Sequence, residues 1–336
     1  MGVCAKGFAG VSSTANHVVI TGGAGFIGSH VAEALVRRGL QVSIVDSLDD
    51  FYSPAAKRAN LEAVRMVGDF TFYGIDLCDF DALREAIAEA RPDAIIHLAA
   101  RAGVRPSIEN PQLYERVNVG GTVNLLELAR QLSVKRFVFG SSSSVYGITN
   151  KVPFAEDDPC LRPISPYAAT KLAGEFFCHT YAHLYGISTL CLRFFTVFGP
   201  RQRPDLAIRK FATLMLAGKP IPVFGDGSTG RDYTFVDDIV AGVLAALDYE
   251  FPAGAPPFDI FNLGNSHPVS LNELIAMLER VSGRVAIRER KDLQPGDVPI
   301  TWANTDKAAR MLGYRPSTPL AEGLEQFVRW LRVSNA

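Results

Sequence analysis

The sequence has little cysteine, no excess of charge of one sign and no long apolar run. Its five cysteines are odd in number, are scattered and form no Cys-x-x-Cys pair, which argues against a disulfide framework or a zinc site and favours free thiols in a reducing cytoplasm. The 34 Lys and Arg residues nearly balance the 35 Asp and Glu residues, so no basic surface for nucleic acid is expected. Because no run of about eighteen apolar residues occurs, we expect no membrane-spanning helix.

Internal repeats and low-complexity blocks are also absent from the 336 residues. Apolar residues make up 48% and charged residues 21%, which is typical of a globular protein. The chain is long for one compact unit, so two unequal lobes are expected. The first sixteen residues are small and polar, with one Lys and no apolar core. We interpret residues 1–16 as a disordered leader and not as a targeting segment.

Short apolar runs alternate with longer amphipathic stretches over the first two hundred residues. We predict strands at His17–Thr21, Gln41–Val45, Phe70–Gly74, Ala94–Leu98, Arg136–Phe139 and Ser188–Arg193. We predict helices at Phe26–Arg38, Asp81–Glu89, Pro111–Leu132 and Tyr167–Leu184. Most of the apolar runs contain no alternating polar residues, as expected of strands buried on both faces of a parallel sheet. The pattern predicts an α/β fold with a Rossmann-type, doubly wound parallel sheet.

The pattern loosens after Gly199, where segments rich in Pro and Gly interrupt short helices such as Leu271–Val281 and Leu320–Leu331. One later strand, Phe258–Leu263, is apolar enough to rejoin the first sheet. We therefore predict a cofactor-binding domain over residues 17–198, joined by the strand at 258–263. Residues 199–336 would form most of a smaller C-terminal substrate-binding lobe, with a discontinuous boundary and a cleft between the two parts.

A glycine-rich turn joins the first strand to the first helix. Gly22 and Gly25 allow a tight turn and the close approach of a pyrophosphate, and Gly28 allows the helix to pack closely on the strand. Asp46 ends the next strand, eighteen residues after Gly28, where a carboxylate binds the adenine ribose and repels a 2′-phosphate. Since Ser47 follows instead of an Arg, the motif predicts NAD and not NADP.

The spacing of these glycines resembles that of the extended short-chain dehydrogenases, and the resemblance covers nearly the whole chain. It implies further cofactor contacts from segments that follow the other strands. These contacts are Phe26, Ile27, Asp76, Leu77, Leu98, Ala99, Ala100, Asn118 and Ser141.

Tyr167 and Lys171 stand four residues apart, so they share one face of a helix. An ammonium close to a phenol favours the phenolate and lowers the pKa of the phenol. The phenolate can then take a hydroxyl proton while hydride leaves the same carbon for nicotinamide. Upstream, a strand ends in a cluster of serines, and the family resemblance makes Ser142 the hydroxyl that binds the reacting oxygen. We predict Ser142, Tyr167 and Lys171 as the catalytic triad, with Tyr167 and Lys171 also contacting NAD.

The residues after Ser142 distinguish the reactions of this family. Sugar-nucleotide dehydratases carry an Asp-Glu pair there, and UDP-glucuronate decarboxylases carry a Glu two residues before the equivalent of Tyr146, whereas this chain has Ser143 and Ser144. The resemblance therefore implies epimerisation at C4 of a UDP-sugar through a 4-keto intermediate. Thr196 and Gln294 resemble the UDP-glucuronate 4-epimerases, because galactose epimerases usually carry Asn and Arg there. A UDP-glucose/galactose 4-epimerase and a UDP-glucuronate decarboxylase remain alternatives.

The 4-keto intermediate of a hexuronate is a β-keto acid, which loses carbon dioxide when its carboxylate bond aligns with the carbonyl π system. Neutral donors can hold the carboxylate out of that alignment, and a cation can pair with it. The predicted substrate contacts are Ser142, Ser143, Ser144 and Thr196 for the sugar, Arg203 or Arg105 for its carboxylate, Arg231 for the diphosphate, and Lys210, Val223 and Asp297 for the uridine.

The resemblance also implies a homodimer in which the helices Pro111–Leu132 and Tyr167–Leu184 of two copies form a four-helix interface. No metal is expected, although His179 and His183 have a spacing that can bind zinc. These two histidines have no obvious third ligand in the sequence.

Overall fold

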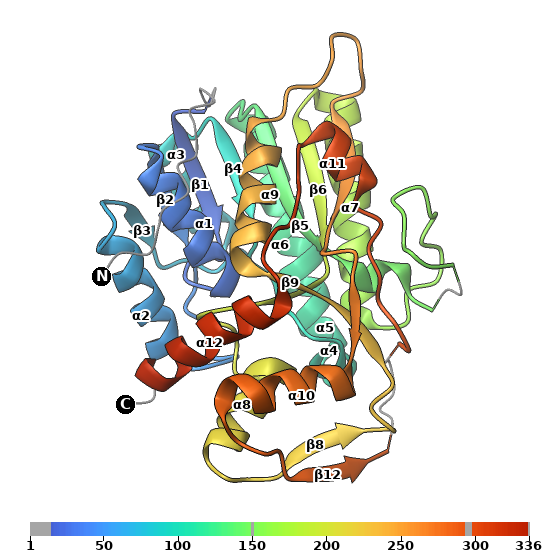
Figure 1. Ribbon diagram of the computed structural model, residues 1–336. Helices are drawn as coiled ribbons and strands as arrows, with labels where there is room; N and C mark the ends of the chain where they lie inside the picture. The colour runs from blue at the N-terminus through green and yellow to red at the C-terminus, as the bar shows by residue number, and fades with distance from the viewer. Residues whose placement is uncertain (1–14, 149–150, 293–297, 335–336) are drawn as a thin grey trace.

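The computed structural model describes residues 15–148, 151–292 and 298–334, and its centre is a seven-stranded sheet (Figure 1). The strand order is β10-β6-β5-β4-β1-β2-β3, and every neighbouring pair is parallel. Because the winding direction reverses between β1 and β4, the loops there diverge and leave a crevice at the carboxyl ends of the strands. The predicted doubly wound sheet is confirmed. Its strands are β1 (His17–Thr21), β2 (Gln41–Val45), β3 (Thr71–Tyr73), β4 (Ala94–His97), β5 (Arg136–Ser142), β6 (Ser188–Phe194) and β10 (Phe258–Leu263).

Helices cover both faces of this sheet, which explains why its strands are apolar on both sides. In β4, Ile96 belongs to the core that packs beneath α1 and α9, whereas Ile95 belongs to the core beneath α3, α6 and α7. On the first face lie α1 (Phe26–Arg37) and α9 (Val236–Asp248), with α2 (Pro54–Arg65) beside α1. On the second face lie α3 (Phe80–Ala90), α6 (Gly121–Gln131) and α7 (Pro166–Tyr185).

The segments after residue 199 form a smaller group below the sheet, seen at the bottom of Figure 1. This group contains α8 (Ala207–Leu216), β8 (Ile221–Phe224), α10 (Leu271–Ser282) and β12 (Arg288–Lys291), and β8 pairs with β12 in parallel. A three-stranded sheet of β11 (Pro268–Ser270), β9 (Gly230–Phe235) and β7 (Thr196–Phe198) lies above it. The remaining helices are α4 (Val104–Glu109), α5 (Pro111–Tyr114), α11 (Asp306–Met311) and α12 (Leu320–Ser334).

The chain departs from the predicted elements at several points. The single helix predicted over Pro111–Leu132 is α5, a π-helical segment η1 (Glu115–Gly120) and α6. The helix α9 was not predicted, because it is buried on most sides and shows no amphipathic stripe. Ala15 and Asn16, assigned to the leader, belong to the fold, since Ala15 is buried and the Asn16 amide donates to Asp93 Oδ2 at 2.7 Å.

The rest of the predicted leader lies outside the described residues. Among the described helices, none combines the length and the apolar character needed to cross a bilayer. The four described cysteines are free thiols, as the sequence predicts.

Candidate functional site

A cavity of about 570 Å³ lies at the carboxyl ends of the central strands. Its walls come from the segments that follow β1, β2, β4, β5 and β6. A cavity of this size at the reversal point of a doubly wound sheet is where this class of fold binds its ligands. It is therefore the candidate site.

The glycine turn forms one end of the cavity and is shaped for close approach of a ligand. Gly22 has a φ of +72°, and a β-carbon there would stand 2.7 Å from the amide nitrogen of Ala99. A β-carbon on Gly28 would stand 2.2 Å from the Gly22 carbonyl oxygen. The helix α1 starts at Gly25 without a side-chain cap, so its first amides are left for an anion, and the cradle fits the pyrophosphate of a dinucleotide.

Asp46 lines the cavity beyond the glycine turn, at the end of β2. Its Oδ2 accepts a hydrogen bond from the Ala24 amide at 3.1 Å, and its Oδ1 accepts one from the Leu48 amide at 2.9 Å. Burial raises the pKa of this carboxyl, and the Lys57 ammonium opposes that shift. Each carboxylate oxygen keeps lone-pair capacity for another donor, so this end of the cavity fits the hydroxyls of the adenine ribose.

The predicted cofactor contacts line the cavity with one exception. Gly22, Gly25, Phe26, Ile27, Gly28, Asp46, Asp76, Leu77, Leu98, Ala99, Ala100, Ser141, Tyr167 and Lys171 all do so. Asn118 does not, because it is buried in η1 beneath the loop after β4. Its Oδ1 accepts from the Arg101 amide at 2.7 Å, and its Nδ2 donates to the Arg101 carbonyl at 2.9 Å and to Thr170 Oγ1 at 3.0 Å. Asn118 therefore fixes the loop that carries Ala99 and Ala100.

Ser142, Tyr167 and Lys171 meet in the same cavity from two elements. Ser142 ends β5, and the other two residues lie in the first turns of α7, which begins where Ser165 Oγ accepts a hydrogen bond from the Ala168 amide at 3.1 Å. The Lys171 ammonium donates to the Gly140 carbonyl oxygen at 2.7 Å. Burial lowers the pKa of Lys171 to about 8.

The phenol of Tyr167 does not show the lowered pKa that its spacing from Lys171 predicts. Burial raises its pKa, while the hydrogen bond with Ser142 and the charge of Arg203 act in the opposite direction. The ammonium of Lys171 is directed to the backbone of β5 instead of the phenol. A further positive charge in the cavity is needed to favour the phenolate.

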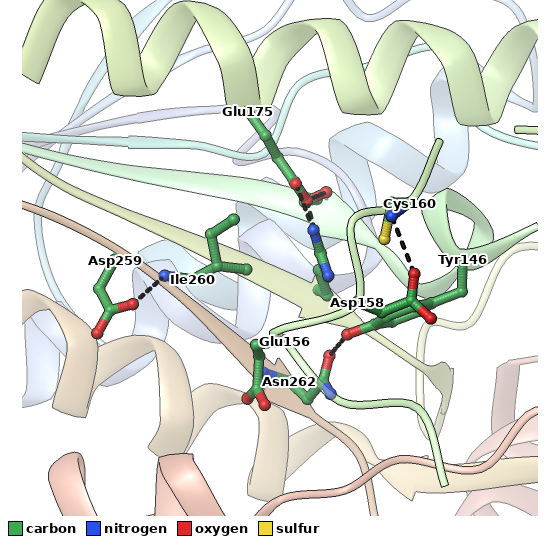
Figure 2. Close-up of polar contacts among 10 residues, drawn as sticks. Tyr146, Glu156, Asp158, Cys160, Glu175, Asp259, Ile260 and Asn262 are labelled. Carbon is green, nitrogen blue, oxygen red and sulfur yellow. Dashed lines mark hydrogen bonds and ion pairs between the residues drawn. The ribbon is translucent and has the colours of Figure 1, made fainter. Parts of the chain in front are cut away.

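A buried ion pair connects α7 to the sheet, and its Glu175 is labelled in Figure 2. Glu175 accepts two hydrogen bonds from Arg193 of β6, at 3.0 and 2.8 Å, and one from Ser141 Oγ at 2.5 Å. Arg193 also lies over the ring of Tyr146, whose hydroxyl donates to Asn262 Oδ1 at 2.7 Å. This network, which the sequence analysis missed, joins the ends of β5, β6 and β10 to α7.

Only some of the predicted substrate contacts line the cavity. Ser142, Ser143, Ser144, Thr196 and Arg203 do, and Arg203 makes a two-bonded ion pair with Asp205 at 3.0 and 2.8 Å. The other described candidates, Arg105, Lys210, Val223 and Arg231, lie outside it, and Asp297 falls outside the described residues.

Those four residues belong to the outer elements of the cleft. Arg105 is exposed on α4 with its guanidinium 4.7 Å from the Phe224 ring centroid, and Lys210 is exposed on α8. Val223 is buried in β8, and Arg231 of β9 donates to the Gly230 carbonyl at 2.7 Å. Five further residues line the cavity although the sequence assigned no role to them, namely Phe51, Tyr52, Lys57, Arg101 and Leu206. The first three belong to the stretch that runs from the end of β2 into α2.

Comparisons with known proteins agree with this geometry. UDP-glucuronate 4-epimerase of Thermodesulfobacterium geofontis is 43% identical over 315 residues, which cover 94% of this chain and 95% of that protein. The crystal structure of UDP-glucuronic acid 4-epimerase from Bacillus cereus with UDP-glucuronic acid and NAD has a TM-score of 0.87 at 35% identity, covering 95% of this chain and 99% of that one.

UDP-glucose 4-epimerase from Thermotoga maritima, solved with UDP-glucose, also has a TM-score of 0.87, at 32% identity, covering 95% of this chain and 100% of that one. Residues 18–264 match the sequence model of a family that takes its name from NAD-dependent epimerases and dehydratases. The chain belongs to the NAD-dependent epimerase/dehydratase family.

Proposed function

We propose that the protein is an NAD-dependent UDP-sugar 4-epimerase that interconverts UDP-glucuronate and UDP-galacturonate. The observation that carries the proposal is that Ser142, Tyr167 and Lys171 share one cavity with the glycine turn and Asp46. The similarity to UDP-glucuronate 4-epimerases supports the substrate. Residues 17–198 with β10 would hold NAD, and the lobe built mainly from 199–336 would hold the UDP.

Each residue of the triad has a distinct task in this proposal. NAD⁺, when bound, would supply the hydride acceptor and a positive charge. Tyr167 takes the proton of the C4 hydroxyl, and Ser142 donates a hydrogen bond to the same oxygen as it becomes a carbonyl. Lys171, held by the Gly140 carbonyl, keeps a second positive charge in the cavity. After the keto-sugar presents its other face, Tyr167 returns the proton and C4 regains hydride.

A hexuronate suits the far end of the cavity better than a hexose. Ser143, Ser144 and Thr196 offer neutral hydroxyls there, and Arg203, which is paired with Asp205, keeps further N–H donors. These groups can bind a C5 carboxylate and hold it away from the alignment that expels carbon dioxide. The uridine would lie toward Lys210, Val223 and Arg231.

Incubation of the pure protein with UDP-glucuronate and, separately, with UDP-glucose tests this proposal. Proton NMR should show UDP-galacturonate from the first substrate and little change in the second. UDP-galactose as the main product would establish the galactose-type alternative, and a UDP-pentose would establish a decarboxylase. Absence of every product would refute the enzymatic proposal.

Ser144→Ala and Thr196→Ala should each raise the fraction of UDP-pentose by-product about tenfold, since each removes a hydrogen bond to a charged group. NMR of the product mixture from UDP-glucuronate measures the fraction. Thr213→Ala, on the exposed side of α8, is the control. Unchanged product ratios in both cavity variants would count against these residues as holders of the carboxylate.

We also propose a cytoplasmic homodimer formed through α7 and the segment Pro111–Leu132, which comprises α5, η1 and α6. Four large apolar side chains of α7 face solvent in the single chain, namely Phe176 and Leu184, each 60% exposed, Tyr185, 50% exposed, and Phe177, 37% exposed. A cluster of this kind marks an interaction surface, and the free cysteines fit a reducing compartment.

Light scattering should give twice the chain mass for the wild type and a monomer for Phe176→Glu. Leu161→Glu, exposed elsewhere, should remain dimeric, and a monomeric wild type would contradict the proposal.

A further inference from the structure

Tyr52 carries a hydroxyl whose place in the fold has no structural explanation. The residue stands between β2 and α2, and its side chain lines the cavity. The hydroxyl oxygen is closed off from solvent, and it finds no hydrogen-bond partner among the described residues. An unpaired buried hydroxyl destabilises a protein, so a phenylalanine would serve packing better at this position.

The hydroxyl of Tyr52 faces the glycine turn. A β-carbon on Gly25 would have the Tyr52 hydroxyl oxygen 3.9 Å away, and Gly25 is the residue at which α1 begins without a side-chain cap. The charges that act on this phenol come from Asp46 on one side. On the other side they come from Arg203, Arg209 and the carboxylate of Asp205. The hydroxyl therefore lies beside the glycine turn, between Asp46 and the charged groups that surround Arg203.

The phenol is a proton donor at neutral pH. Burial raises the pKa of Tyr52 to about 12, and the carboxylate of Asp46 adds to that shift. An O–H group of this kind can donate to an anionic oxygen, and such charge-assisted hydrogen bonds are among the strong ones.

Cations hold the ring without using its hydroxyl. The Lys57 ammonium lies 5.0 Å from the centroid of the Tyr52 ring. The neighbouring ring of Phe51 has the guanidinium groups of Arg101 and Arg203 at 5.9 and 5.4 Å. These contacts fix the segment against the cavity and use the faces of the rings, so none of them gives the hydroxyl of Tyr52 a hydrogen-bond partner.

We propose that Tyr52 donates a hydrogen bond to the diphosphate of the dinucleotide, across the phosphates from the amides of the glycine turn. This inference rests on the proposed function, because it requires that the cavity bind NAD. It adds to that function a residue that binds the cofactor from the loop after β2, a part of the chain where only Asp46 was assigned a role.

The test compares binding by the full-length chain, freed of bound nucleotide, with that by Tyr52→Phe, using calorimetry. The dissociation constants of NAD and of ADP-ribose should each rise about tenfold or more in the variant, as expected for a lost hydrogen bond to a charged group. The dissociation constant of adenosine, which has no phosphate, should change little. Thermal melting of the nucleotide-free variant should occur at the same or a higher temperature, since the unpaired hydroxyl is gone.

Tyr249→Phe is the matched control, because this ring packs against Phe251 and Phe261 outside the cavity. An unchanged NAD dissociation constant in Tyr52→Phe would overturn the inference and leave the proposed function intact. An equal loss for adenosine would also overturn it, since the contact would then be to the nucleoside. A wild-type chain that binds no NAD would overturn the proposed function and this inference together.

Discussion

Tyr167→Phe is expected to slow the interconversion of UDP-glucuronate and UDP-galacturonate by about 10²- to 10⁴-fold, the usual contribution of a positioned acid–base group. The substitution removes the atom that accepts the C4 hydroxyl proton and keeps the ring. Ser142 and Lys171 are held by β5 and the body of α7, so the cavity should keep its shape. The initial rate of product formation, followed by NMR, measures the effect.

The readout that separates chemistry from folding is cofactor binding. Tyr167→Phe should bind NAD with an affinity close to that of the wild type and show an unchanged melting temperature. Tyr181→Phe, on the same helix with its hydroxyl bonded to Glu127 at 3.3 Å, should retain full activity. Interconversion at the wild-type rate in Tyr167→Phe would remove the phenol from the reaction and with it the proposed mechanism.

Glu175→Leu is expected to lower the free energy of unfolding by about 3–5 kcal/mol, because it leaves the guanidinium of Arg193 buried without a counter-charge. Arg193 and Glu175 have side chains that are only 3% and 2% exposed. The variant also removes the acceptor of the Ser141 hydroxyl, so the end of β5 loses a contact with α7. Urea denaturation measures the loss.

The double variant Glu175→Leu with Arg193→Met should regain most of that stability, since replacing both members of a buried pair with apolar groups is often close to neutral. Glu62→Leu is the exposed control, because Glu62 lies 3.9 Å from Arg65 on the surface of α2, and its loss should stay within about 0.5 kcal/mol. A loss below about 1 kcal/mol in Glu175→Leu would show that the ion pair does not fix β6 to α7.

The central sheet could be predicted from the sequence because most of its strands are buried on both faces and read as continuous apolar runs. The same reasoning failed for α9, where burial on most sides removes the polar stripe that identifies a helix. The π-helical turns of η1 were missed as well. Within them Asn118 holds the backbone of the loop after β4, a contact between distant segments that the local sequence does not reveal.

The site was predictable where function depends on local spacing. Gly22, Gly25 and Gly28 are required by backbone contacts within one turn, and Tyr167 and Lys171 share one face of α7. Interactions between distant segments were not predictable. The pair of Glu175 with Arg193 and the position of Tyr52 over the glycine turn depend on packing that no spacing reveals.

The pKa of Tyr167 was predicted in the wrong direction for a related reason. Proximity along α7 suggested that the ammonium of Lys171 would act on the phenol. The ammonium instead donates a hydrogen bond to the backbone of β5, and burial has the largest effect on the pKa of the phenol.

The parallel pairing of β10 with β6 has a consequence for how the chain acquires its structure during synthesis. The last strand to be synthesised, β10, begins at Phe258, some sixty residues after β6 ends at Phe194. It can pair with β6 only once it has left the ribosome. Until then β6 is an open edge, and open edges pair with other chains. We expect a product truncated before β10 to aggregate, so the half of the molecule that contains the glycine turn is not a separable module.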